Sequence, residues 1–417
     1  MDETWDVVVI GGGAAGMMAA GTAAHALGKG GRVLLIEKND TLGKKLLITG
    51  GGRSNVTNNE PDTRKLLSKF KESEQFLFSA FSQWSVEETL KFFNGRGMPT
   101  KEEALKRVFP ASNSAQSVWD TLVAYMKEGK VEVLSKSPVD ELLVEEGKVM
   151  GVRLKNKKEI HAKKIILATG GFSHPETGST GDGAKMLKKV GHKVEPPATT
   201  LVPITTSDEW AHQIPGLSFQ EVKISLFQNS VKQYSQVGKV LFTHQGLSGP
   251  GILNASSEIG ELLKYGEVLL ELDIVPHFSY DTLNAKLQEL FKVHHTKKLK
   301  NALADLVPHS LIEPLAELSK INFDIPANSV SRDARNKLVK LLKHIPFHPT
   351  GLLGEDKAII TSGGVDLTEI DFKTMQSRLY PNLYIVGDLL NIDRPSGGYS
   401  LQLCWTTGHV AGKSAAQ

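Results

Sequence analysis

The stretch Asp6-Val-Val-Val-Ile10, followed at once by Gly11-Gly-Gly-Ala-Ala-Gly16, decides the fold of this chain. A short β-branched apolar run of this kind is typical of a buried parallel strand. Gly11, Gly13 and Gly16 have the G-x-G-x-x-G spacing, and the small residues that follow can form a helix. In such a unit the first glycine permits the tight turn, the second lets a pyrophosphate approach the backbone, and the third lets the helix pack on the strand. We therefore expect the start of this helix to bind a dinucleotide.

A second predicted strand supports this interpretation. The run Arg32-Val-Leu-Leu-Ile-Glu37 ends in a carboxylate 21 residues after Gly16. An acidic residue about 20 residues beyond the glycine motif accepts hydrogen bonds from ribose hydroxyl groups. Since a carboxylate repels a 2′-phosphate, NADP is disfavoured at this site.

Composition limits the remaining interpretations. The uncharged stretch Val7–Ala24 lacks a basic region before it and contains several glycines, so we predict no membrane insertion. The single cysteine, Cys404, excludes an intramolecular disulfide and suits a reducing cytoplasm. A net charge of +3 over 417 residues gives no support to nucleic acid binding by bulk charge.

Glycine is distributed unevenly along the chain. Residues 194–350 contain seven of the 39 glycines, and the other two parts of the chain contain 32. This distribution predicts one glycine-rich domain that is interrupted by an insertion. We expect a discontinuous FAD-binding domain formed by residues 1–193 and 351–417. Within the insertion, strand-like runs continue up to Asp273 and runs with helical periodicity begin at Tyr280. This order predicts a β-rich insertion domain over 194–275 and a helical subdomain over 276–350.

Three further glycine-containing segments indicate FAD, and not NAD, as the expected dinucleotide. In Lys44–Asn58, three consecutive glycines are flanked by basic residues, so that backbone N–H groups can face a ligand. In Lys164–Gly171, an apolar strand ends in Ala-Thr-Gly-Gly, after two runs that alternate like an antiparallel ribbon. In Asn382–Gln402, a strand ends in Gly-Asp, and Gly397-Gly398 precedes a small-residue helix. A carboxylate at that strand end can hold a ribityl chain, and the helix start can stabilise negative charge on a reduced flavin.

Together these motifs resemble the glutathione-reductase-type FAD-binding fold, an α/β Rossmann-like parallel sheet with an antiparallel ribbon. Over nearly the whole chain, the sequence resembles the YhiN/BaiN-like family of NAD(FAD)-utilising flavoproteins. The resemblance implies FAD contacts at Gly11, Gly13, Gly16, Glu37, Arg53, Val139, Gly170, Asp388, Gly398 and Leu401. Neighbouring residues of the same motifs complete the expected cofactor site: Ala14, Ala15, Lys38, Lys44, Gly51, Gly52, Asn55, Ala168, Thr169, Gly387, Gly397, Tyr399 and Ser400.

The expected function is that of a cytoplasmic FAD-containing oxidoreductase. We expect hydride transfer linked to NADH or NADPH, with a small or medium organic acceptor such as an activated C=C bond. The chain has one cysteine and no second G-x-G-x-x-G motif. In the family that it resembles, many members carry a cysteine at the position of Ser54. A dithiol mechanism is therefore not expected, and NADH or NADPH would act as a transient donor without its own Rossmann domain.

Two alternatives from other classes remain. One is an FAD-dependent protein that binds or modifies tRNA, and the other is a non-catalytic redox-sensing flavoprotein. The insertion contains 15 basic and 16 acidic residues over 194–350. This balance argues against a nucleic acid partner, because phosphate contacts need clustered Lys and Arg. A small-molecule substrate is the expected partner, and the oligomeric state stays open.

Candidates for acid–base and metal chemistry are few. No His/Cys cluster has metal-ligand spacing, so no metal site is expected. His244 lies between a predicted strand and a glycine turn, where it could act as an acid or base, although a structural role is the more common one. Tyr399 and Arg53 lie nearer the expected flavin, as a candidate proton donor and a candidate anion clamp.

Overall fold

The computed structural model describes residues 4–263, 265–353 and 360–417. Internal contacts divide the chain into two units, which we describe separately. Unit 1 comprises residues 1–199 and 359–417, and unit 2 comprises residues 200–358. The unit boundaries therefore lie several residues beyond the expected ones at 193 and 351. The predicted strand from Lys357 to Val365 begins outside the described residues, and the described part is β18 (Ile360–Val365).

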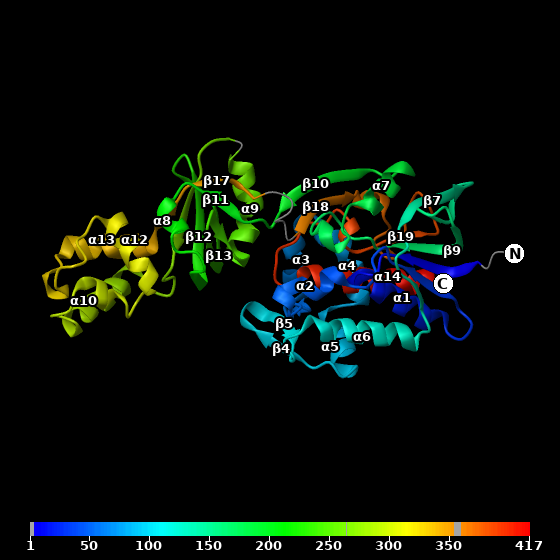
Figure 1. The fold of residues 1–417 in the computed structure, drawn as a ribbon, viewed down its shortest axis with the longest axis horizontal. Helices are drawn as coiled ribbons and strands as arrows, with labels where there is room; N and C mark the ends of the chain where they lie inside the picture. The colour runs from blue at the N-terminus through cyan, green and yellow to red at the C-terminus, as the bar shows by residue number, and fades with distance from the viewer. Residues whose placement is uncertain (1–3, 264, 354–359) are drawn as a thin grey trace. The chain divides into compact units, whose positions relative to one another are not determined.

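Unit 1 is built on a sheet with the strand order β6-β2-β1-β9-β8-β7, in which β19 also pairs with β9 (Figure 1). Its parallel strands are β1 (Trp5–Ile10), β2 (Val33–Ile36), β6 (Glu132–Leu134), β9 (Glu159–Leu167) and β19 (Leu383–Ile385). The predicted antiparallel ribbon is confirmed as β7 (Val139–Glu145) and β8 (Lys148–Leu154). Val7, Val8 and Val9 have no exposed surface, because β1 lies inside the sheet with both faces covered.

Two helices rich in small residues pack closely against each other in unit 1. They are α1 (Ala14–Leu27) and α14 (Tyr399–Ala415), drawn in blue and red in Figure 1. A Cβ atom at Gly408 would lie 2.5 Å from the Ala15 carbonyl oxygen, and one at Gly412 would lie 2.4 Å from the Ala19 oxygen. The small residues in both helices thus allow backbone-to-backbone contact, which joins the first and last segments of the chain.

The remainder of unit 1 consists of helices and a small sheet. The helices are α2 (Lys44–Gly52), α3 (Thr63–Leu67), α4 (Glu74–Gln83), α5 (Val86–Gly95), α6 (Ala115–Glu128) and α7 (Asp182–Lys189). The small sheet has the order β3-β5-β4, from β3 (Thr57–Asn58), β4 (Thr100–Glu103) and β5 (Arg107–Pro110). In a separate two-stranded sheet, β10 (Val194–Thr200) pairs with β18, so the segments that leave and re-enter unit 1 lie side by side.

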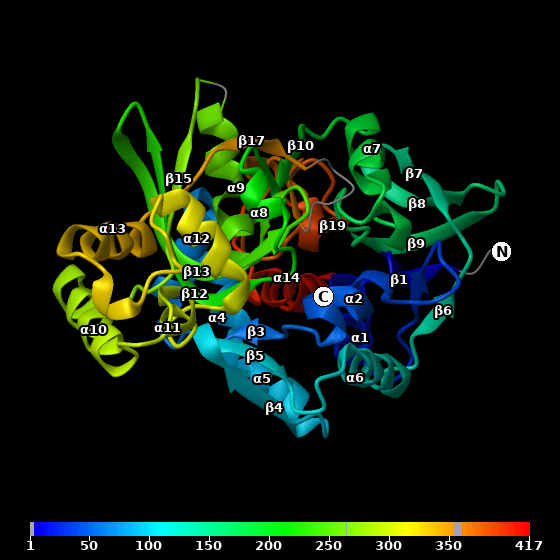
Figure 2. The same cartoon turned by 60° about the vertical axis from the view of Figure 1, so that its left-hand side comes forward.

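Unit 2 contains an antiparallel sheet with the order β16-β15-β12-β13-β14-β11-β17. Its long strands are β12 (Ser218–Gln228), β13 (Val231–Thr243) and β15 (Leu269–Asp273), and the shorter ones are β11 (Ile204–Thr206), β14 (Gly246–Ser248), β16 (Ile345–Phe347) and β17 (Pro349–Leu352). The helices are α8 (Glu209–His212), α9 (Pro250–Leu263), α10 (Tyr280–Val293), α11 (Leu299–Leu303), α12 (Ile312–Ser319) and α13 (Arg332–Lys343), several of which are visible in Figure 2.

Strands and helices of unit 2 share one hydrophobic core. Ile224 and Leu272 from the sheet belong to the same buried cluster as Leu287 and Leu338 from the helices. The expected division of the insertion into a β-rich domain and a helical subdomain at residue 275 therefore stays a prediction. The strand-rich part does come first along the chain, and the helical part follows.

Candidate functional site

The carboxyl ends of three parallel strands bring the predicted motifs together. β1, β9 and β19 are adjacent, and their register aligns Ile10 with Leu167 and Leu167 with Ile385. Backbone hydrogen bonds continue past the strand ends, from Ala168 N to Ile10 O (2.8 Å) and from Val386 N to Leu167 O (3.1 Å). The Gly11, Ala168–Gly170 and Gly387 segments therefore meet at one sheet edge. Ligands bind at such an edge in open α/β sheets.

The first glycine motif shapes a close turn with free space above it. Gly11 has φ +102°, and a Cβ atom there would lie 2.5 Å from the Ala168 oxygen. A Cβ atom at Gly16 would lie 1.8 Å from the Gly11 oxygen, whereas one at Gly13 would meet nothing within 4 Å. The turn and helix α1 thus pack tightly where the motif predicts. At Gly13, where a pyrophosphate is expected, there is room beside the helix N-terminus.

Glu37 is placed at the end of β2, as predicted. Its side chain is buried and accepts hydrogen bonds from Gly12 N (2.7 Å) and Asn39 N (2.8 Å). These bonds hold the carboxylate against the glycine turn, and a carboxylate retains acceptor capacity for ribose hydroxyl groups beyond two such bonds. Its neighbour Lys38 instead donates to Asp182 (2.7 Å) and Thr180 (2.6 Å). Lys38 thereby joins the expected cofactor segment to the start of α7.

Asp388 lies between two cations at the sheet edge. Arg394 donates to one carboxylate oxygen, and Lys45 Nζ lies 3.3 Å from the other and also donates to Ser173 Oγ (2.6 Å). Burial is the largest effect on Asp388 and opposes its ionisation, but the charges of Arg394 and Lys45 hold the pKa of this carboxyl below its ordinary value. An ionised cluster of one anion and two cations has a net positive charge, which suits an anionic ligand such as a diphosphate.

Two of these groups were not among the residues expected to contact the cofactor. The sequence placed Lys44 in the site, yet Lys44 forms an ion pair with Asp40 (2.9 Å), and it is Lys45 that reaches Asp388. Arg394 was not singled out at all. A basic residue six positions after a Gly-Asp strand end could have been noticed, but only the fold shows that its guanidinium turns back toward Asp388.

The second glycine pair fits into the small β3 sheet. A Cβ atom at Gly398, which has φ +102°, would lie 2.3 Å from the Thr57 carbonyl carbon. The Asn55 amide, oriented with its oxygen toward Gly398 N (3.0 Å), also donates to Thr57 O and Val108 O. Asn55 therefore fixes the loop that was expected to face the flavin. Its predicted contact with the cofactor stays a prediction.

The segment after Gly398 begins helix α14. Tyr399 is the first residue of the helix, is 9% exposed, and packs edge-to-face on Phe70 with ring centroids 5.9 Å apart. Burial, and to a lesser extent the charge of Glu60, raises the pKa of Tyr399, so its phenol stays protonated at neutral pH. Ser400 accepts a hydrogen bond from Arg394 Nε (3.1 Å), and Leu401 is buried.

Other predicted residues lie in different settings. The guanidinium of Arg53 is bonded to Glu103 and Asn113 and lies over the Phe109 ring (4.2 Å), so an anion clamp there would have to compete with these partners. Val139 is the first residue of β7. His244 is exposed in the turn after β13, in unit 2. Gly50, Gly51 and Gly52 have φ between +58° and +81°, so the backbone leaves the right-handed helical conformation at the end of α2, at the three glycines that were expected to permit unusual backbone conformations.

Several observations fit the site to a bound dinucleotide. Ser54 is buried and Thr169 is half-buried, and the buried hydroxyl oxygens of both residues have no hydrogen-bond partner among the described residues. Buried polar groups normally have a partner, so these two hydroxyls leave capacity for a ligand. Ser54 also has φ +58°, a conformation that is costly for a residue with a side chain. Together with the space at Gly13 and the cationic cluster, these features fit FAD.

The residues described by the structure contain no group of three or more His, Cys, Asp or Glu side chains that could hold a metal ion. Nor does any helix within that part of the chain have the length and apolar character needed to cross a membrane. Burial, followed by the charge of Asp388, raises the pKa of the Cys404 thiol to about 12.

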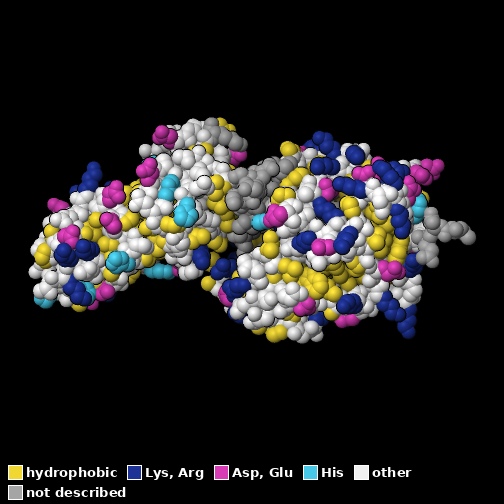
Figure 3. Space-filling view, in the orientation of Figure 1, with side chains coloured by type: hydrophobic (Ala, Val, Ile, Leu, Met, Phe, Trp, Pro, Cys, Tyr) yellow, Lys and Arg dark blue, Asp and Glu magenta, His cyan; other side chains and the backbone are white. Residues whose placement is uncertain are grey.

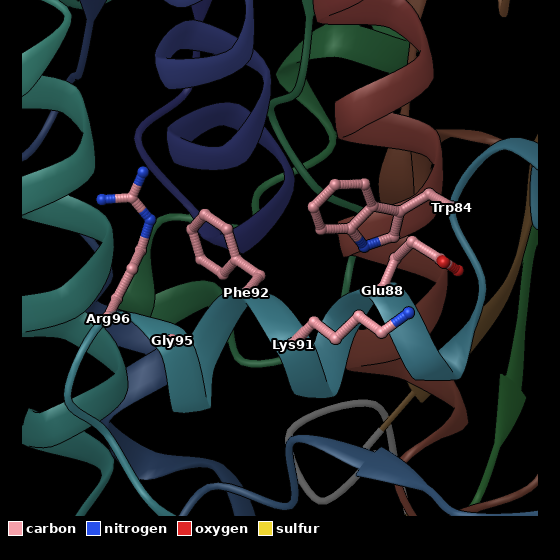
Figure 4. A pocket seen from close by; sticks show the side chains of 6 residues that line it. All are labelled: Trp84, Glu88, Lys91, Phe92, Gly95 and Arg96. Carbon is pink, nitrogen blue, oxygen red and sulfur yellow. The ribbon is translucent and has the colours of Figure 1, made fainter.

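An open pocket of about 540 Å³ lies elsewhere on unit 1, along helix α5 (Figure 4). Arg96 lies over the Phe92 ring at 5.0 Å, and Trp84 donates to Thr89 (2.9 Å). None of the predicted cofactor residues lines this pocket, whose lining consists of Trp84, Glu88, Lys91, Phe92, Gly95 and Arg96. It is a surface feature of one helix and does not belong to the candidate site.

The fold and the site define a Rossmann-type FAD-binding oxidoreductase. The family model described as "HI0933-like protein Rossmann domain" matches residues 5–414, and the chain belongs to this family. It is 31% identical to the "Ribosomal RNA dihydrouridine synthase" of Escherichia coli, over 97% of this chain and 96% of that protein. It is also 29% identical to the "3-dehydro-bile acid delta(4,6)-reductase" of Clostridium scindens, over 98% of each chain.

A solved structure with the same fold is the 3-ketosteroid-delta4-(5alpha)-dehydrogenase of Rhodococcus jostii RHA1. It has a TM-score of 0.54 and 16% identity, and the match covers all of this chain and 98% of that one. The expected family and the expected FAD-binding fold are thus confirmed, as is the assignment to the oxidoreductases.

Proposed function

We propose that this protein is an FAD-dependent reductase of a C=C bond conjugated to a carbonyl group, with NADH or NADPH as electron donor. One observation carries the proposal. The two relatives above match the whole chain, and their names denote the same chemistry on different molecules. Dihydrouridine is uridine whose C5=C6 bond, conjugated to the C4 carbonyl, has been saturated. A delta(4,6)-reductase of a 3-dehydro compound saturates bonds conjugated to a ring ketone.

Bound FAD would supply the hydride-transfer chemistry that links a nicotinamide donor to a conjugated acceptor. The protein binds and orients this group. Glu37 would hold the adenosine ribose, and the N-terminus of α1 at Gly13 would hold the pyrophosphate. Asp388 would hold ribityl hydroxyl groups, and Lys45 balances the phosphate charge.

The chain also offers groups for the transition state. Hydride addition to an enone places negative charge on the carbonyl oxygen, and the product needs a proton. Tyr399 is a protonated phenol at the start of α14, beside the loop expected to face the flavin, and we assign it as the proton donor. Backbone N–H groups at the same helix start would stabilise negative charge on the flavin pyrimidine ring.

A thiol route has no support from the site. Cys404 is the single cysteine of the chain and its thiol has a pKa of about 12, so almost no thiolate is present at neutral pH. Cys404 would therefore take no part in the electron transfer that bound FAD would supply. A lone protonated thiol of this kind also suits the reducing cytoplasm in which we propose that the protein acts.

The proposal is tested by anaerobic flavin reduction and reoxidation. Protein purified with its flavin, or reconstituted with FAD, is titrated with NADH and NADPH, and the reduced flavin is mixed with a panel of acceptors. We expect reoxidation by 2-cyclohexenone or by uridine in RNA, with the saturated product found by mass spectrometry. Reoxidation by oxygen alone, without product from any conjugated acceptor, would favour a redox-sensing flavoprotein and refute the proposal.

A further inference from the structure

The charge of unit 2 is segregated along the chain, although the unit as a whole is close to neutral. Residues 200–284, which include most of the strands, contain nine acidic and four basic residues. Residues 285–350, which include most of the helices, contain eleven basic and six acidic residues. Charges separated by more than about 8 Å are largely screened at physiological ionic strength, so the local balance decides which ligands a surface attracts. The helical part is therefore electropositive.

The positive charge is also free for a ligand. In the helical part, Asp324 pairs with Lys298 (2.9 Å) and Lys300 (2.8 Å), and Asp305 pairs with His294 (2.6 Å). Exposed basic residues with no ion-pair partner among the described residues are Lys292, Lys297, Lys320, Arg332, Lys337 and Lys340. The acidic residues of this part without such a partner are Glu313, Glu317 and Asp333.

Three of the free cations lie on one side of helix α13. Leu338, Val339 and Leu342 of this helix are buried in the core of unit 2. The other side exposes Arg332, Asn336, Lys337 and Lys340, which we call the α13 patch, together with one acidic residue, Asp333, so this side carries three positive charges and one negative charge. Residues four apart share a helix face, so Arg332, Asn336 and Lys340 form one row with successive rises of about 6 Å.

Helix α13 is held firmly beneath this patch. Lys343 at its end is buried and pairs with Asp273 (2.6 Å). Helix α10 packs beside it, with Arg335 Nε donating to Asn284 Oδ1 (2.6 Å). Both helices are visible together in Figure 2, and Figure 3 shows Lys, Arg and His side chains over this lobe, with acidic ones between them. The patch therefore lies on a helix that is anchored to the rest of unit 2 through Lys343 and Arg335.

The chemistry of the patch selects its partner. An amphipathic helix that binds a membrane inserts its apolar side, but the apolar side of α13 is already buried in the core of unit 2. A protein interface needs a large apolar or aromatic anchor, and the exposed residues of α13 include none. Long cationic side chains with an amide between them match the phosphates and 2′-hydroxyl groups of RNA.

We propose that the α13 patch binds the phosphate backbone of an RNA that carries the uracil substrate. This inference rests on the proposed function, and specifically on RNA as the carrier of the conjugated C=C bond. The near-neutral count over 194–350, from which the sequence argued against nucleic acid, averages two parts of opposite charge. Phosphate contacts made by the patch would set orientation and affinity, and the choice of base would be made elsewhere.

The test compares two triple variants of the full-length protein carrying its flavin. One is Arg332→Gln/Lys337→Gln/Lys340→Gln, which neutralises the patch. The matched control is Lys223→Gln/Lys232→Gln/Lys239→Gln, which removes the same charge from the strand-rich part of unit 2. Binding to fluorescently labelled transcripts of ribosomal RNA is measured by anisotropy at salt concentrations from about 50 to about 300 mM, because phosphate contacts weaken as the salt concentration rises.

We expect the patch variant to bind RNA at least about tenfold more weakly, with a salt slope smaller by about 2, as three lost phosphate contacts imply. The control should change affinity by less than about twofold, because its charges lie on strands β12 and β13 and not on the α13 patch. Equal weakening in both variants would overturn the proposal. The proposal would also be overturned if polyglutamate competed for the protein as effectively as unlabelled RNA does. It would likewise be overturned if the wild-type protein bound anionic vesicles and the patch variant did not.

The outcome is separable from that of the proposed reaction. Reoxidation of the reduced wild-type flavin by 2-cyclohexenone needs no RNA. If this reoxidation and the reduction of RNA uridine both fail while patch-dependent RNA binding is observed, the reaction is refuted and the binding surface is not. If the reaction occurs but the wild-type protein binds no RNA, or the patch variant binds RNA as tightly as the wild-type protein does, the proposed RNA-binding surface is refuted. The proposed reaction is not.

Discussion

Arg394 and Asp388 form an ion pair across six residues of chain, in which the Arg394 side chain is 1% exposed and the Asp388 side chain is 19% exposed. The guanidinium also donates to the carbonyl oxygen of Ile392 (2.7 Å) and to Ser400 (3.1 Å). The pair therefore joins the Gly-Asp turn after β19 to the first residues of α14. The loop expected to face the flavin depends on this link for its shape.

Replacing Asp388 by asparagine should destabilise the protein strongly. Arg394 would remain buried without an anionic partner, and breaking one half of a buried pair costs about 3–5 kcal/mol. The free energy of unfolding is measured with denaturant. The double variant Asp388→Asn/Arg394→Met removes both charges and should recover much of this loss, but it should not recover FAD affinity. Recovery of FAD binding in the double variant would contradict a cofactor role for Asp388.

The glycine at 398 should tolerate no side chain. Gly398→Ala would place a methyl group 2.3 Å from the Thr57 backbone in a left-handed conformation. Gly147→Ala is the matched control, because Gly147 also has positive φ (+75°) but open space around it. We expect the control to lose about 1–2 kcal/mol, and Gly398→Ala to lose more and to purify without flavin. Similar losses in both variants would show that the close contact at Thr57 is relieved by movement.

Stability should fall in mild acid because of His409. Burial, and then the charge of Lys413, lowers the pKa of His409 to about 4, below its ordinary value of 6.5. Since the folded state resists protonation, this stabilisation is complete above pH 6.5, declines as the pH falls toward 4, and amounts to at most about 3 kcal/mol. His409→Gln should flatten the difference in unfolding midpoint between pH 7 and pH 4.5. An unchanged difference would mean that other groups cause the acid sensitivity.

Tyr399→Phe tests the assigned proton donor. Loss of the phenol should slow reoxidation of the reduced flavin by a conjugated acceptor by about 10²–10⁴-fold. Reduction of the flavin by NADH or NADPH, followed by its absorbance under anaerobic conditions, should change little. The ring contact with Phe70 is retained, so folding serves as an internal control. If both half-reactions slow equally, Tyr399 acts by shaping the site and not by proton transfer.

The Cys404 thiol should be inert in the folded protein. Because the pKa of this thiol is about 12, a soluble disulfide reagent at pH 8 should not react with the native protein. After unfolding in guanidinium, one equivalent of thiol should react. Cys404→Ala should leave flavin reduction by NAD(P)H unaffected. Rapid labelling of the native protein would reveal an accessible thiolate and reopen a thiol-based route.

The family and the FAD-binding half of the fold could be read from local sequence. Each glycine motif follows its own strand, and in a parallel sheet such strand ends must meet at one edge, so Gly11, Gly170 and Gly387 could be assigned to one place before the fold was known. The individual contacts could not. Lys44 and Lys45 are adjacent residues of the same type, so the sequence does not distinguish them. Their positions on α2 place Lys44 beside Asp40 and Lys45 beside Asp388.

The sequence by itself determined the Rossmann-type strand–turn–helix, the interruption, and the position of Glu37, because each depends on residues close together in the chain. Tertiary structure alone decided the Arg394–Asp388 pair, the use of Asn55 to fix the Gly398 loop, and the choice of Lys45 over Lys44 as a partner of Asp388. These features depend on which side chains face one another after the chain folds back on itself.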